Sequence, residues 1–110
     1  MADRSPHNAP VLVIGLGRFG AATAQQLRRQ NKEVLAIERD PDMVQKWSGL
    51  LTHVIQADAS DIDALRQVGA GDFTSAVVGV GTSIESSVLI TANLVDLGIE
   101  RIWALSLIHI

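Results

Sequence analysis

Short apolar segments of strand length alternate along this chain with amphipathic stretches of helix length. The first apolar segment, Val11 to Ile14, is continuous and rich in β-branched residues, which is typical of a strand buried on both faces. Further strands are expected at 33–38, 53–57, 74–80 and 101–104. Helices are expected between them at 18–31, 41–48, 60–69 and 83–97. Strands and helices that alternate through short connections predict one α/β domain built on a parallel sheet.

Two pairs of residues predict where helices begin. Asp40 followed by Pro41 predicts an N-cap and a first-turn proline, whose missing N–H costs nothing at that position. Ser60 and Asp63 resemble a capping box and predict that the next helix starts at Ser60. Gly98 is expected to end the longest helix.

Composition narrows the classes of protein to which the chain can belong. Of its 110 residues, 47% are hydrophobic and 19% are charged, which is enough for a folded core. The net charge of −3 offers no basic surface for DNA or RNA. No apolar run approaches the roughly 18 residues of a membrane-spanning helix, and the polar segment 1–10 is expected to be a flexible leader. We therefore expect a soluble, cytoplasmic module.

A glycine-rich string of the form G-x-G-x-x-G follows the first strand and opens the first helix: Gly15, Leu16, Gly17, Arg18, Phe19 and Gly20. In that context Gly15 permits a tight turn, Gly17 lets a pyrophosphate approach the backbone, and Gly20 lets the helix pack close to the sheet. The N–H groups at the start of the helix would face the phosphates. The alternative is that the glycines serve only a tight strand–helix turn.

Glu38 ends the second strand, 18 residues past Gly20. Dinucleotide-binding folds place an acidic residue about 20 residues beyond the glycine loop to accept hydrogen bonds from the ribose hydroxyls. Such a carboxylate repels a 2′-phosphate and favours adenosine nucleotides or NAD over NADP, although Arg39 could partly neutralise that phosphate. The alternative is that Glu38 is a solvated charge at the end of a strand.

The segment after the third strand carries Asp58, Ala59 and Ser60. Ligands of doubly wound sheets lie across the carboxyl ends of the strands, so Asp58 could accept a hydrogen bond from an adenine amino group. Asp58 and Ser60 could instead only cap the following helix. The segment from Gly79 through Gly81 to Thr82, at the end of the fourth strand, is expected to form a flexible lip on the same edge, although turn geometry alone could explain its glycines.

Arg18 occupies a variable position of the glycine loop and should project near the phosphates. The helix dipole slightly disfavours a cation in this first turn, which makes a phosphate-sensing role the sharper interpretation. The alternative is an arginine that simply faces solvent.

The chain lacks the residues that a reaction centre needs. It has no cysteine and no tyrosine, which excludes thiol chemistry and mechanisms that require a phenol. Its histidines are not spaced as metal ligands, and His53 is interpreted as a packed strand residue. The sequence therefore predicts a nucleotide site without catalytic or metal-binding residues, and no enzyme activity. The alternative is the cofactor-binding half of an NAD-dependent dehydrogenase.

From about Val11 to Ala104, the chain resembles the regulator of potassium conductance (RCK) family, in its N-terminal or TrkA-N domain. The resemblance rests on the segments 11–20, 33–38, 52–60, 81–87 and 97–103. Its most specific motifs are Gly-Arg-Phe-Gly at 17–20, Asp-Ala-Ser at 58–60 and Gly-Ile-x-x-Ile-Trp at 98–103. The closest likeness is to the cytoplasmic regulatory subunits of bacterial Trk/Ktr potassium uptake systems.

This resemblance implies a Rossmann-type, doubly wound parallel sheet of about five strands in the order 3-2-1-4-5. It implies ATP, ADP or NAD(H) as a regulatory ligand, held by the glycine loop, Glu38 and the segment 58–60, with Arg18 at a terminal phosphate. It also implies a homo-oligomeric ring on the inner face of the membrane, bound to a potassium-translocating membrane subunit.

The end of the chain departs from the family pattern. Family members continue into a further helix, a sixth strand and a second domain, so we expect the domain at 11–104 to be an incomplete, C-terminally truncated version. The last six residues, Leu105 to Ile110, are those encoded by CTG TCT CTT ATA CAC ATC, the transposon end used in preparing sequencing libraries. We interpret 105–110 as a non-native tail; the alternative is a genuine extension of the fifth strand.

Overall fold

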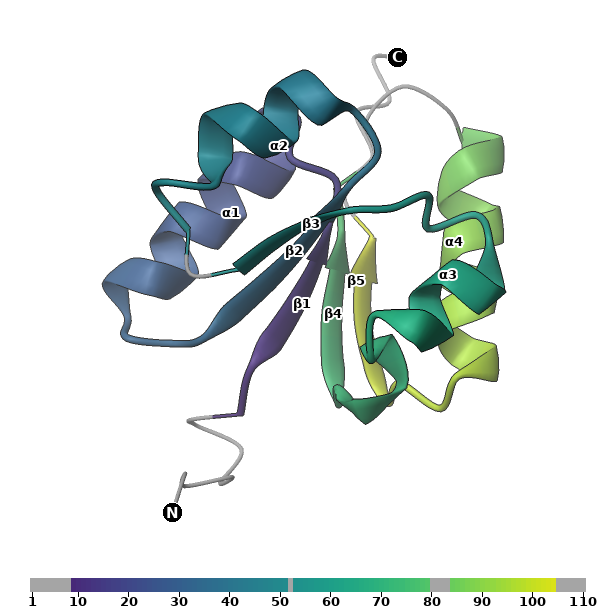
Figure 1. Cartoon of the computed structure of the whole chain (residues 1–110). Coiled ribbons are helices and arrows are strands. Elements are labelled where there is room, and N and C mark those ends of the chain that lie inside the picture. The colour runs from purple at the N-terminus through teal and green to yellow at the C-terminus, as the bar shows by residue number, and fades with distance from the viewer. Residues whose placement is uncertain (1–8, 52, 80–83, 105–110) are drawn as a thin grey trace, which may run out of the picture.

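A computed structural model of the chain describes residues 9–51, 53–79 and 84–104. Five parallel strands form one sheet in the order β3-β2-β1-β4-β5 (Figure 1). Their bounds are β1 (Val11–Ile14), β2 (Val34–Glu38), β3 (His53–Gln56), β4 (Ser75–Val78) and β5 (Arg101–Ala104). This confirms the predicted α/β class and strand order. Residues 1–8 of the expected leader and the expected tail at 105–110 lie outside the described residues.

The helices cover both faces of the sheet (Figure 1). One layer holds α1 (Arg18–Arg29) and α2 (Pro41–Trp47), and the other holds α3 (Ile62–Gln67) and α4 (Ile84–Asp96), with a short 3₁₀ turn at Ala70–Asp72. Alternate residues of the strands serve the two layers, so Val13 and Ala36 pack with α1 while Leu12 and Ile37 pack with the opposite side. The result is the Rossmann-like, doubly wound arrangement that the family resemblance implies.

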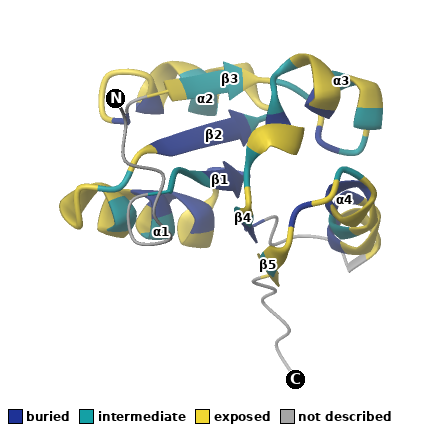
Figure 2. Ribbon diagram, turned by 90° about the horizontal axis from the view of Figure 1, so that it is seen from below, coloured by how far each residue is buried: buried dark blue, intermediate teal, exposed yellow. Residues whose placement is uncertain are grey.

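Burial falls off from the centre of the sheet to its edges (Figure 2). The central strands β1, β2 and β4 are almost wholly buried, whereas β3 and β5 consist of half-buried and exposed residues. His53 is exposed at the start of β3, so the prediction that it is a packed strand residue was wrong. It lies on an edge strand, where fewer neighbours cover each side chain.

Capping residues define the helix starts, with one correction to the sequence analysis. Asp40 caps α2 as predicted, and its carboxylate accepts a hydrogen bond from the Asp42 N–H at 2.9 Å. The cap of α3 is Asp61 rather than Ser60, because the Asp61 carboxylate accepts from the Asp63 N–H at 3.0 Å. Gly98 ends α4 with φ of 87°, the left-handed conformation expected of a C-terminal glycine.

A close approach between backbones fixes α1 to the sheet. A methyl group added at Gly20 would lie 1.7 Å from the carbonyl oxygen of Gly15, and one added at Gly79 would lie 2.9 Å from the Gly20 Cα. No side chain fits at either glycine unless the helix moves. The first turn of α1 therefore sits directly against the ends of β1 and β4.

We expect Gly20→Ala to destabilise the domain by about 3 kcal/mol, because the new methyl group forces α1 away from the Gly15 carbonyl. Chemical denaturation followed by circular dichroism would measure this loss. Gly49→Ala is the matched control, since nothing lies within 4 Å of its added methyl group. Equal stabilities of the two variants would show that α1 does not need its close approach to the Gly15 carbonyl.

Candidate nucleotide-binding site

A cavity of about 410 Å³ opens at the carboxyl ends of the central strands. It is bordered by the glycine loop, the end of β2, the segment after β3 and the inner side of α4. Its lining includes seven of the predicted site residues: Gly15, Gly17, Glu38, Arg39, Asp58, Ala59 and Ser60. Parallel strands bring these segments to one edge although they are far apart in the sequence.

The three glycines of the loop differ in the structural constraint that acts on each of them. Gly15 adopts φ of 90°, a left-handed conformation that permits the turn, and its N–H donates to the Ile37 carbonyl at 2.8 Å. Gly20 is required by its contact with Gly15. Gly17 has neither constraint: its φ is −68° and an added methyl group would meet no atom within 4 Å. The space beside Gly17 belongs to the cavity.

The start of α1 is left without side-chain compensation. Gly17 is its N-cap, makes no side-chain capping bond, and no acidic residue follows in the first turn. The positive end of the helix dipole and its first N–H groups therefore have no carboxylate of α1 beside them. Such a helix start favours an anionic ligand.

The other predicted residues of the loop lie away from the cavity lining. The Leu16 side chain is fully buried in the core beneath α1, so Leu16 contributes only its backbone to the surface of the glycine loop. Arg18 and Phe19 lie on the exposed side of the first turn. Gly20 packs against Gly15. Of the expected lip, Gly79 lines the cavity, whereas Gly81 falls outside the described residues.

The Glu38 carboxylate joins two backbone segments. Its Oε1 accepts a hydrogen bond from the Leu16 N–H and its Oε2 accepts one from the Asp40 N–H, each at 2.7 Å. The carboxylate is therefore not merely a solvated charge at a strand end. Because each oxygen has two acceptor positions, Glu38 can still accept hydrogen bonds from a ligand in the cavity.

Asp58 forms a compact turn with Ser60. Its Oδ1 accepts from the Ser60 Oγ at 2.6 Å and from the Ser60 N–H at 2.9 Å. The hydroxyl bond, then the backbone bond and the charge of Arg39 lower the pKa of Asp58 below its ordinary value, against a small opposing effect of burial. Asp58 is therefore ionised at neutral pH and acts only as a hydrogen-bond acceptor. It does not cap α3, which Asp61 does.

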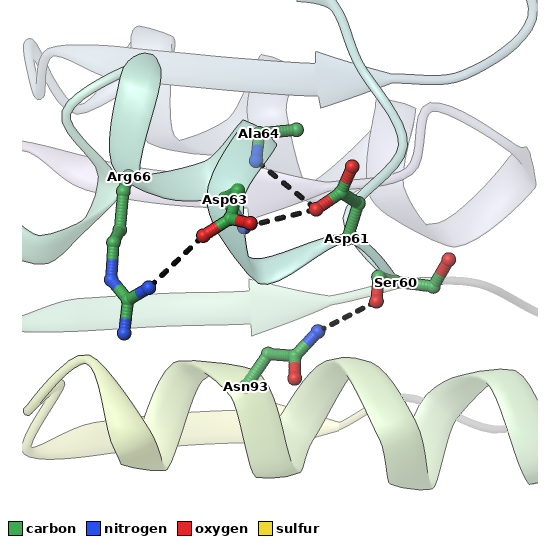
Figure 3. Close-up of polar contacts among 6 residues, drawn as sticks. All are labelled: Ser60, Asp61, Asp63, Ala64, Arg66 and Asn93. Atoms are coloured by element: carbon green, nitrogen blue, oxygen red, sulfur yellow. Dashed lines mark hydrogen bonds and ion pairs between the residues drawn. The ribbon is translucent and has the colours of Figure 1, made fainter.

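Asn93 of α4 contacts the segment after β3 from outside the cavity lining and was missed by the sequence analysis. Asn93 is only 8% exposed, and its Nδ2 donates to the carbonyl oxygen of Ala59 at 3.1 Å. The same nitrogen donates to the carbonyl oxygen of Ser60 at 3.0 Å (Figure 3). The available signal was a lone amide between apolar residues of the longest helix. Ser86 and Ile90, on the same side of α4, line the cavity.

The part of the chain that the structure describes contains neither a metal site nor a membrane-spanning helix. No group of three or more histidine, aspartate or glutamate side chains there is arranged to hold a metal ion. No helix among the described residues is long and apolar enough to cross a bilayer.

The chain is similar to proteins of potassium uptake. It is 35% identical over 96 residues to Ktr system potassium uptake protein A of Bacillus subtilis, and 34% identical over 90 residues to Ktr system potassium uptake protein C of the same organism. These matches take in 87% and 82% of this chain but only 43% and 41% of the relatives, so the chain spans about two-fifths of their length.

A solved structure described as the GsuK channel bound to NAD has the same fold, with a TM-score of 0.72 at 13% identity over 96% of this chain and 19% of that one. The model of the TrkA-N domain family matches residues 11–106. That match covers nearly the whole chain and includes every element of the sheet and of the cavity. The chain therefore belongs to the TrkA-N domain family.

Proposed function

We propose that this chain is the nucleotide-sensing domain of a regulatory protein that controls potassium uptake. The observation that carries the proposal is the cavity in which Gly17, Glu38 and Asp58 meet. It offers an uncompensated helix start, a carboxylate at the end of β2 and a second carboxylate beyond β3. These features suit, in order, the phosphates, the ribose and the base of an adenine nucleotide.

The ligand we propose is ATP, ADP or NAD(H), bound as a signal rather than as a substrate. Gly17 leaves room for the phosphates beside the first N–H groups of α1, and Glu38 accepts hydrogen bonds from the ribose hydroxyls. Asp58 accepts a hydrogen bond from the adenine amino group. Arg18, which lies outside the cavity lining, would reach a terminal phosphate, either of its own ligand or of a neighbouring subunit's.

The proposed partners are a membrane potassium-translocating subunit and further copies of the regulatory protein, arranged as a ring on the cytoplasmic side of the membrane. Support comes from the relatives, which are named as Ktr system potassium uptake proteins. A nucleotide that binds one state of the ring more tightly shifts the population toward that state. The same relatives favour a regulatory role over the alternative, in which the chain is the cofactor-binding half of an NAD-dependent dehydrogenase.

We expect Glu38→Arg to abolish binding of ATP, ADP and NADH, because the substitution replaces the ribose acceptor with a cation. Glu38→Gln, which keeps one acceptor oxygen, should weaken binding by about tenfold. Isothermal titration calorimetry of the purified chain would measure both. Glu33→Arg makes the same charge change at an exposed position just before β2 and should leave affinity unchanged. Unaltered binding by Glu38→Arg would refute the ribose assignment.

Gly17→Ala separates ligand binding from folding. The added methyl group meets no protein atom within 4 Å, so we expect the free energy of unfolding to fall by only about 1 kcal/mol, the cost of alanine at an N-cap. The same methyl group occupies the space proposed for the phosphates and should weaken ATP binding at least about tenfold. Denaturation and calorimetry on one preparation give both values. Wild-type affinity in this variant would show that the phosphates do not lie beside Gly17.

A further inference from the structure

We propose that Asn93 is the positioning residue for the base-binding side of the cavity, because its amide fixes the Asp58–Ser60 turn to α4. The inference rests on the proposed function in one respect, namely that the cavity holds an adenine base beside Asp58. It adds a residue from a distant helix to a site otherwise formed by segments that follow the strands.

The contact joins two segments that are far apart in the sequence. Asn93 lies 34 residues from Ala59, and its Nδ2 donates to the carbonyl oxygens of two successive residues, Ala59 and Ser60. Figure 3 shows the bond to Ser60. The Asn93 side chain and Ala59 are both buried. Without the amide, the buried Ala59 carbonyl would lose this partner, which is costly, and the half-buried Ser60 carbonyl would lose its link to α4.

The hydrogen bonds within the turn fix its shape, whereas the bonds from Asn93 fix its position. Asp58 accepts from Ser60, and the Asp61 N–H donates to the Asp58 carbonyl at 3.1 Å. These bonds fix the shape of the turn. The Asn93 bonds fix its position relative to α4, and thereby the position of the Asp58 carboxylate at the cavity.

The face of α4 that carries Asn93 also borders the cavity. Ser86, Ile90 and Asn93 are spaced at i, i+4 and i+7, so they lie along one side of the helix. Ser86 and Ile90 line the cavity, and Asn93 donates a hydrogen bond to the turn at 58–60. A single rigid helix therefore sets the distance between the turn and the rest of the site.

Base selectivity follows from this placement. An ionised carboxylate only accepts hydrogen bonds, so Asp58 favours the 6-amino group of adenine and disfavours the 6-oxo group of hypoxanthine. That discrimination requires the carboxylate to lie at the correct position. Asn93 should therefore control the ratio of ATP to ITP affinity, beyond any effect on stability.

The test compares ATP and ITP binding by calorimetry for the wild-type chain, Asn93→Leu and Leu94→Val. Asn93→Leu keeps a similar volume but removes both donors, and it should lower the ATP-to-ITP affinity ratio by about tenfold. Leu94→Val perturbs the adjacent buried core position of the same helix, so it should lower stability and leave the ratio unchanged. If Asn93→Leu does not fold, Asn93→Ala replaces it, because its smaller side chain lets water reach the two carbonyls.

A second measurement needs no nucleotide. Nuclear Overhauser contacts between Ala59, in the turn, and Ile90, on α4, report the position of the turn relative to the helix, because both residues belong to the same buried cluster. Asn93→Leu should weaken these contacts, whereas Leu94→Val should keep them. Either a wild-type ATP-to-ITP ratio or wild-type contacts in the Asn93 variants would overturn the inference. If the wild-type chain binds neither nucleotide, the proposed function fails, and the contacts alone decide whether Asn93 positions the turn.

Discussion

The contact between the first turn of α1 and the end of β1 is the constraint on which the rest of the site depends. Gly20 has no room for a side chain against the Gly15 carbonyl, so the helix start is held at the carboxyl edge of the sheet. That position leaves the Leu16 N–H within 2.7 Å of Glu38 and buries the Leu16 side chain in the core. The phosphate end and the ribose end of the proposed site are thus built from the same close approach.

The two carboxylates proposed to bind the ligand also hold the protein together. Glu38 links the glycine loop to the start of α2, and Asp58 closes the turn after β3. A structural role and a binding role are therefore not alternatives at these positions. Backbone donors fix the direction of each carboxylate before a ligand arrives, which reduces the entropy lost on binding. Part of the effect of replacing Glu38 will consequently appear as lower stability of the ligand-free domain.

Local patterns predicted the strands and most of the cavity residues, and the resemblance to a known family supplied the strand order. Continuous apolar runs mark the buried strands, and the topology then brings Gly17, Glu38 and Asp58 to one edge. Two features depended on competition or distance and were not predicted. Asp61 caps α3 in place of Ser60, whose hydroxyl is engaged by Asp58. Asn93 finds its partners 33 and 34 residues away, which helical periodicity cannot reveal.

The site draws on both helical layers of the sheet, and this bears on how it could act as a sensor. The helix start proposed to face the phosphates belongs to α1, whereas the turn proposed to lie beside the base is tied by Asn93 to α4, on the opposite face. A nucleotide that contacts both ends therefore bridges the two layers. Its affinity must change if α4 shifts relative to α1, because a fixed ligand cannot follow both ends at once. Differential affinity of this kind is what a regulatory ligand requires in order to shift a population between states.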